Sequence, residues 1–257
     1  MNQAQIAVNY ILDRLPAFPQ SCVILGSGLG YFCNKLQCPI KISYAEIPHY
    51  PLSSIKGHSG DWIFGYINEK PIICASGRFH YYEGFTEEEI LLSVTIAKSL
   101  GCKLLVITNS AGCLNKEWNL GDFMLITGYL DYTFSNNSDP PKIILFERNT
   151  INYKKVKYAA LDLDILLKEG IYTWTLGPSF ETPAEIQDII SLGGHAVGMS
   201  TVPEMMKAKE IGLEIIGISC FTNYGAGMQA GILTHEDVLI NSNKIHKKFS
   251  SFIQKII

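Results

Sequence analysis

The stretch CVILGSGLG, residues 22–30, joins a short apolar run to a turn that contains three glycines. The apolar residues 22–25 predict a buried β-strand, and the glycines let the following backbone amides turn towards an anion. A dinucleotide-binding fingerprint is excluded, because it needs glycine at position 31, where the chain has Tyr31. Taken alone, the turn is as typical of a plain tight turn as of a phosphate loop.

Short runs of strand-forming residues alternate with helical patterns along the rest of the chain. The expected strands cover residues 22–25, 62–67, 72–75, 104–108, 123–127, 143–146, 172–176 and 215–221. Apolar residues at three- and four-residue steps predict a helix between Thr86 and Gly101, and further helices are expected to begin at Thr182 and Thr234. Polar residues 136–157 are expected to be the longest excursion from the core. This alternation predicts an α/β fold.

Composition limits the classes of function. The 257 residues are 47% hydrophobic, so we expect one domain over residues 1–257 with a full core. A net charge of -3 with scattered Lys and Arg argues against nucleic acid as a partner. Residues 1–14 lack the features of a signal peptide, and no apolar run reaches the roughly 18 residues that span a bilayer, so we expect no membrane association and a cytoplasmic location. Seven cysteines without a CxxC pair are expected to be reduced and buried.

The motif GRFHYYEG, residues 77–84, follows the apolar run 72–75. In an extended segment Arg78, His80 and Tyr82 share one face, because side chains alternate along a strand. Arginine suits bidentate contact with a tetrahedral oxyanion, so phosphate is the natural guest. A surface hairpin with scattered polar side chains is the alternative interpretation.

A second histidine motif, GHSG, covers residues 57–60 and, like the arginine motif, is expected where a loop leaves a strand. His58 and His80 can each donate a hydrogen bond to an oxyanion. The two histidines lack a third ligand at a recognisable spacing and the chain has no HExxH motif, so no metal site is expected.

Two motifs combine small residues with side chains that have no evident structural task. TNSAG, residues 108–112, comes at the carboxyl end of an apolar strand, where open α/β sheets place their ligands, although a helix-capping turn is equally typical of it.

In GPSFETPAE, residues 177–185, Thr182 and Glu185 can form a capping box, so neither Phe180 nor Glu181 is needed to cap the helix. The ring can stack on a base and the carboxylate can accept a purine N–H; a staple contact by Phe180 and a solvated Glu181 are the alternative.

The motifs GMSTVPE, residues 198–204, and TNYGAG, residues 222–227, complete the set. Asn223 can both donate and accept hydrogen bonds, which suits the edge of a purine. His235 lies near the start of the last predicted helix, where it can be a cap neighbour, a neutral imidazole influenced by the helix dipole, or a contact to a sugar hydroxyl. For a lone histidine, a structural role is the more common outcome.

In this order, these seven motifs and the later HED at residues 235–237 resemble the trimeric purine nucleoside phosphorylase family, over residues 21 to about 240. The resemblance implies one domain with a twisted mixed β-sheet flanked by helices, assembled as a homotrimer with active sites near the subunit contacts. It also implies an enzyme of purine salvage, a pentosyltransferase that cleaves (deoxy)inosine and (deoxy)guanosine with inorganic phosphate to give free base and (deoxy)ribose 1-phosphate. Phosphate is then a co-substrate, and no cofactor or metal is needed.

The resemblance implies a role for each motif residue. The residues expected to bind phosphate are Ser27, His58, Arg78, His80, Ser110 and Ala111 through their backbone, and Ser200. The residues expected to bind the nucleoside are Tyr82, Phe180, Glu181, Met199, Asn223 and His235. The residues expected to be catalytic are Asn223, Glu181 and His80.

The chain departs from the family pattern at two places. Relatives carry a longer loop whose phenylalanine reaches into the neighbouring subunit's site, and Phe134 is the candidate for that ring in this chain. Ser110 and Cys113 stand where relatives often have alanine and glycine. Two alternatives remain open: phosphorolysis of 5′-methylthioadenosine, for which the related branch favours an aspartate at the base site, and a purine-binding protein without catalysis.

Overall fold

The structure, a computed structural model, describes residues 3–53, 59–135, 140–229 and 234–257. Within these ranges, the side chains of residues 235, 243 and 244 are not described. The prediction for His58 therefore lies outside the described residues, as does the side chain of His235.

A single mixed sheet contains all ten strands of the described residues. The strands are β1 (Ser21–Ile24), β2 (Gln37–Ser43), β3 (Asp61–Ile67), β4 (Lys70–Ser76), β5 (Leu104–Cys113), β6 (Phe123–Asp131), β7 (Ile143–Leu145), β8 (Lys168–Trp174), β9 (Ala196–Gly198) and β10 (Glu214–Tyr224). One half of the sheet runs in the order β2-β3-β4-β1-β5. In the other half, β10 pairs with both β5 and β6, so that β5, β10, β6, β8 and β9 close into a ring.

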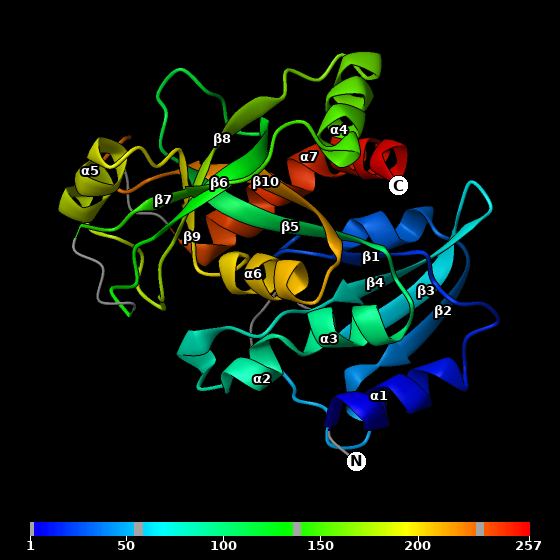
Figure 1. The fold of residues 1–257 in the computed structure, drawn as a ribbon. Coiled ribbons are helices and arrows are strands. Elements are labelled where there is room, and N and C mark those ends of the chain that lie inside the picture. Colours follow the sequence, from blue (N-terminus) through cyan, green and yellow to red (C-terminus); the bar gives the residue numbers. More distant parts are fainter. Residues whose placement is uncertain (1–2, 54–58, 136–139, 230–233) are drawn as a thin grey trace.

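Helices cover both faces of this sheet (Figure 1). They are α1 (Gln3–Leu12), α2 (Glu87–Ile90), α3 (Leu92–Ser99), α4 (Ile151–Asp162), α5 (Pro183–Ser191), α6 (Val202–Glu210) and α7 (His235–Ile256), with short 3-10 helices η1 (Gly30–Lys35), η2 (Tyr44–Glu46) and η3 (Tyr81–Glu83). Helices α1, α3 and α6 pack in one hydrophobic cluster, and α4 and α7 pack in another on the opposite face. None of the described helices is both long and apolar enough to cross a membrane.

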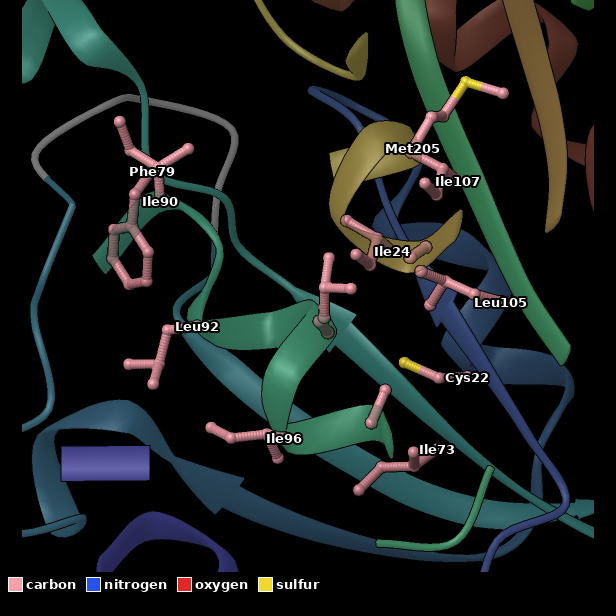
Figure 2. Close-up of a cluster of buried hydrophobic side chains, with 14 of the residues drawn as sticks. Cys22, Ile24, Ile73, Phe79, Ile90, Leu92, Ile96, Leu105, Ile107 and Met205 are labelled. Carbon is pink, nitrogen blue, oxygen red and sulfur yellow. The ribbon is translucent and has the colours of Figure 1, made fainter. Parts of the chain in front are cut away.

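Strand β1 shows why the sheet is buried on both sides. Its side chains alternate, so Cys22 and Ile24 join the cluster of α1, α3 and α6, whereas Val23 joins the cluster of α4 and α7. Figure 2 shows Cys22 and Ile24 beside side chains of β4 and β5, with Met205 of α6 nearby. A strand with two buried faces favours apolar residues on both of them, which is why residues 22–25 form a continuous apolar run.

The predicted strands are all present, with shifted bounds, and the predicted caps at Thr86, Thr182 and Thr234 are confirmed. The helix predicted between Thr86 and Gly101 is divided at Leu91, whose φ of -87° and ψ of 0° depart from helical values. Helices α1, α4 and α6 and strands β2 and β9 were not predicted.

Two expectations are wrong in part. The segment 136–157 contains the predicted strand β7, but the end of the segment is helical, because Thr150 caps α4 by accepting a hydrogen bond from the Tyr153 backbone amide at 3.1 Å.

All seven cysteines are free thiols, and six are buried, but Cys38 is exposed.

Candidate active site

A pocket opens where four mutually parallel strands, β1, β4, β5 and β10, reach their carboxyl ends. Open α/β sheets bind their ligands at this edge. The predicted site residues that line it are Ser27, Arg78, His80, Tyr82, Ser110, Phe180, Glu181, Met199, Ser200 and Asn223. Motifs spread over nearly 200 residues of sequence therefore meet in one cavity.

Arg78 is the buried cation of the pocket, with only 3% of its surface exposed. Its Nε donates to Oε1 of Glu204 at 2.9 Å, and its Nη1 donates to the Thr108 carbonyl at 3.1 Å and to the Ser200 hydroxyl at 3.2 Å. Glu204 is equally buried, so the pair satisfies the rule that a buried charge needs a partner. The guanidinium is thus fixed before any ligand arrives, and it can bind an oxyanion without reorganising.

The backbone at Thr201 is strained. Its φ of 78° and ψ of -51° are rare for a β-branched residue, and such a conformation costs about 1–3 kcal/mol. The surrounding structure holds it there: the Thr201 amide donates to Oε2 of Glu204 at 3.1 Å, and its hydroxyl accepts from Nδ2 of Asn109 at 3.0 Å. This turn directs the neighbouring Ser200 to the wall of the pocket beside Arg78.

His80 is oriented by Glu83. The Nδ1 atom of the imidazole lies 3.1 Å from Oε1 of Glu83, whose Oε2 accepts from the Ser53 hydroxyl at 2.7 Å. The His80 ring also stacks on Tyr82, with 4.8 Å between centroids. Burial raises the pKa of Tyr82 to about 12, so its phenol stays neutral and can donate a hydrogen bond at neutral pH.

The glycine loop after β1 packs directly on β5. A Cβ atom on Gly26 would lie 2.7 Å from Cα of Asn109, which explains why only glycine fits. The Ser110 hydroxyl donates to the Ser27 carbonyl at 2.7 Å and ties the two segments together. Ser27 and Ser110 both line the pocket beside Arg78.

The end of the pocket away from Arg78, where Asn223 of β10 pairs with Gly112, four residues beyond Thr108 on β5, combines a ring, a carboxylate and an amide. Phe180 is 40% exposed, and Glu181 accepts at Oε1 from the Thr175 hydroxyl at 2.6 Å. Burial raises the pKa of Glu181. The amide of Asn223 is oriented by two hydrogen bonds, since Oδ1 accepts from the Thr222 hydroxyl at 3.0 Å and Nδ2 donates to the Tyr224 carbonyl at 3.1 Å.

Met199 and the ring of Tyr82 form an apolar part of the pocket wall. Both side chains lie against Gly177, which has a φ of 73°, and a Cβ atom there would overlap the Met199 sulfur. The pocket therefore combines a cationic end, an apolar stretch of wall and an end that both donates and accepts hydrogen bonds.

Comparison with known proteins identifies the family. A family model described as the phosphorylase superfamily matches residues 20–257. Purine nucleoside phosphorylase 1 of Geobacillus stearothermophilus is 36% identical over 100% of this chain and 98% of its own length, and purine nucleoside phosphorylase of Bos taurus is 34% identical over 98% and 93%. The chain belongs to the purine nucleoside phosphorylase family. The resemblance inferred from the motifs is confirmed.

Solved structures of the purine nucleoside phosphorylase family share this fold. A Schistosoma purine nucleoside phosphorylase in complex with hypoxanthine has a TM-score of 0.86 and 28% identity, covering 98% of this chain and 95% of that one. Isoform 2 from Schistosoma mansoni, in complex with cytosine and ribose-1-phosphate, has a TM-score of 0.85 and 29% identity, covering 99% and 95%. The predicted mixed α/β fold is confirmed.

Three of the predicted site residues are absent from the described lining of the pocket. The side chain of Ala111 is buried in the core and does not line the pocket. The role expected of its backbone stays a prediction. His58 lies outside the described residues, and His235 is the first residue of α7, where only its backbone is described. The described residues of the GHSG motif, Ser59 and Gly60, lead into β3, and the expectation that the motif leaves a strand falls on residues outside the described ones.

Seven residues that line the pocket were not predicted from the sequence. They are Asn109, Gly112, Val197, Gly198, Gly225, Ala226 and Val238. Val238 lies three residues after His235 on α7, and this helical spacing is a signal that could have found it. Val197 and Gly198 belong to β9, which is too short to have a sequence pattern of its own.

Proposed function

We propose that this chain is a purine nucleoside phosphorylase acting on inosine, guanosine and their deoxy forms, with inorganic phosphate as co-substrate and free base and (deoxy)ribose 1-phosphate as products. The observation that carries the proposal is the buried Arg78–Glu204 pair, which presents a fixed cation to one end of a pocket whose other end holds Glu181 and Asn223. No cofactor or metal takes part in the proposed reaction.

Phosphate binds at the cationic end in this proposal. Its proposed ligands are Ser27, His58, Arg78, His80, Ser200 and the backbone at Ser110 and Ala111. As the glycosidic bond lengthens, positive charge develops on the ribosyl ring, and the phosphate dianion beside it stabilises that charge more in the transition state than in the ground state. Holding phosphate and sugar in line contributes an entropic advantage of up to roughly 7–11 kcal/mol in model reactions.

The sugar and base occupy the rest of the pocket. Ribose lies against Tyr82 and Met199, with His235 near the 5′-hydroxyl, and the purine stacks near Phe180. Negative charge develops on the departing purine, and the Asn223 amide can donate a hydrogen bond to the ring nitrogen or carbonyl that receives it. Glu181 accepts from a purine N–H and fixes the base.

The preference for 6-oxopurines rests on Glu181 and Asn223. An ionised carboxylate only accepts hydrogen bonds, so Glu181 matches a ring N–H of hypoxanthine or guanine. The branch that cleaves 5′-methylthioadenosine favours aspartate at the base site, where this chain has Asn223. A second difference is His235, whose polar ring suits a 5′-hydroxyl better than a methylthio group.

We also propose that one domain forms each subunit of a cytoplasmic homotrimer that serves purine salvage. Phe134 supports the trimer, because its ring is 55% exposed beside Tyr132, at 4.8 Å between centroids, and is available to a neighbouring subunit. Sedimentation equilibrium is expected to give three times the mass of 28.6 kDa, and a monomer would remove this part of the proposal.

The proposed reaction is tested by product release. Purified protein is incubated with inosine, with and without phosphate, and in parallel with 5′-methylthioadenosine. Phosphate-dependent release of hypoxanthine that is faster than release of adenine is expected. Adenine release alone would move the protein to the methylthioadenosine branch, and tight inosine binding without turnover would identify a binding protein.

A further inference from the structure

Thr175 does not line the pocket, but it forms a hydrogen bond with Glu181, which does. It follows β8 directly, is 7% exposed, and its backbone amide donates to the Gly198 carbonyl at 3.0 Å. Its hydroxyl hydrogen has two acceptors within reach: Oε1 of Glu181 at 2.6 Å and the Gly198 carbonyl at 3.4 Å. A charged acceptor at the shorter distance forms the stronger bond, so the carboxylate takes the hydrogen.

We propose that Thr175 is a positioning residue for the purine: its hydroxyl holds Oε1 of Glu181 and sets the orientation in which the carboxylate meets the N–H groups of the base. This inference rests on the proposed function, because it assigns Glu181 to the base. Thr175 is buried, and its backbone amide is bonded to Gly198 at the end of β9, so its position is fixed and the orientation of Glu181 is set before the base binds.

The same hydrogen bond affects the ionisation of Glu181. Burial is the largest influence and raises the pKa of Glu181, and the negative charge of Glu185 on α5 raises it further. The Thr175 hydrogen bond acts in the opposite direction. The other titratable groups on the pocket wall are Arg78, His80 and Tyr82, which come from the segment after β4 and from η3. Loss of the Thr175 hydroxyl therefore raises the pKa of Glu181 and reduces the ionised fraction that can accept from a purine.

The two 6-oxopurines respond differently to this arrangement. Hypoxanthine has one N–H on the edge that a carboxylate can bind, whereas guanine has a ring N–H and an adjacent amino group. Guanine can orient a loose carboxylate by binding both oxygens, because paired donors fix a carboxylate geometrically. Inosine lacks the second donor, so its binding depends more on Thr175 than the binding of guanosine does.

The test compares Thr175→Val, which keeps the shape and removes the hydroxyl, with Thr175→Ser, which restores it. Thr175→Val is expected to raise the KM for inosine about tenfold, the effect of one hydrogen bond to a charged group, and to raise the KM for guanosine much less. The acid limb of kcat/KM for inosine is expected to move to higher pH. Thr175→Ser should return both values towards wild type, and the KM for phosphate should not change.

Thr173→Val is the matched control. Thr173 lies on β8, two residues before Thr175, and is fully buried, but its hydroxyl has no hydrogen-bond partner among the described residues. This variant is expected to match wild type in inosine KM and pH profile. An equal effect of Thr173→Val and Thr175→Val would show a general disturbance of β8 and would overturn the inference.

Calorimetric binding of inosine separates the inference from the proposed function. Wild-type protein that binds inosine without cleaving it would contradict the proposed function, while weaker binding by Thr175→Val alone would still support the inference. Unchanged inosine affinity and an unchanged acid limb in Thr175→Val would overturn the inference even in an active enzyme. Absence of inosine binding by wild type would overturn both.

Discussion

The two ends of the pocket are built in different ways. At the cationic end, Arg78 and Glu204 are each 3% exposed and Thr201 is fully buried, and hydrogen bonds join them to β5 and α6. At the opposite end, Phe180 is 40% exposed and Glu181 lies in the loop before α5. The first end is part of the core, whereas the second end joins Asn223, which is buried on β10, to a loop that lies outside the core.

The difference matches the tasks proposed for the two ends. Phosphate is the same in every turnover and carries concentrated charge, so a rigid cation that needs no reorganisation suits it. The base, by contrast, is either hypoxanthine or guanine. The carboxylate of Glu181 is oriented by one hydroxyl, that of Thr175, so few substitutions are needed to change its contact with the base. Changes at the cationic end should therefore affect both stability and phosphate use, and changes at the base end should affect nucleoside use alone.

The largest effect is expected from Arg78→Met. The substitution removes the proposed phosphate cation and leaves Glu204 buried without its partner, so kcat/KM for phosphate should fall on the order of 10³-fold. The free energy of unfolding should fall by about 3–5 kcal/mol, as for other broken buried pairs. Steady-state kinetics and urea denaturation measure the two effects, and an unchanged KM for phosphate would contradict the phosphate site.

Glu181→Ala should come next and should affect one end only. Loss of the carboxylate is expected to lower kcat/KM for inosine about 100-fold, the size of effect seen when a group that orients a substrate is lost, with the KM for phosphate unchanged. Stability should change little, because the substitution removes a charge whose burial is unfavourable. Glu117→Ala, at an exposed position, is the control, and equal activity of the two variants would mean that the base site is misplaced.

A smaller effect is expected from Glu204→Gln, for which Glu185→Gln is the matched control. Glu185 and Glu204 both accept from the N-cap backbone of a helix, at 2.7 Å and 3.1 Å, but only Glu204 also holds Arg78. Glu204→Gln weakens a charged hydrogen bond to Arg78 and should raise the KM for phosphate about tenfold.

Glu185→Gln should cost at most about 1 kcal/mol of stability as a weakened cap and leave the phosphate KM unchanged. Similar phosphate KM values in the two variants would show that Glu204 acts only as a cap, and the proposed link between α6 and the phosphate site would be wrong.

Local patterns in the sequence predicted much of this architecture. A continuous apolar run indicated residues 22–25 as a buried strand, and Thr-Pro-Ala-Glu indicated the start of α5 at Thr182. The start of α6 at Thr201 was missed although Thr-Val-Pro-Glu has the same spacing of threonine and glutamate, with a proline between them. Helix α4 was missed because its outer face, with exposed Tyr158 and Leu161, hides the periodicity of a half-buried helix.

The contacts that assemble the site could not be read from sequence. Arg78 and Glu204 are 126 positions apart, and nothing in their spacing indicates that they pair. The positive φ of Thr201 depends on a hydrogen bond from Asn109, 92 positions away. Motifs identify which residues carry chemistry, but only the folded chain shows which of them orient the others.

The fate of phosphate tests the proposed phosphorolysis most directly. Inosine and phosphate are incubated with the enzyme, phosphorus NMR follows the phosphate signal, and chromatography follows hypoxanthine. One ribose 1-phosphate is expected to appear, and one phosphate to disappear, for each hypoxanthine released. Free ribose with no loss of phosphate would show a hydrolase, and would contradict phosphate binding at the cationic end of the pocket.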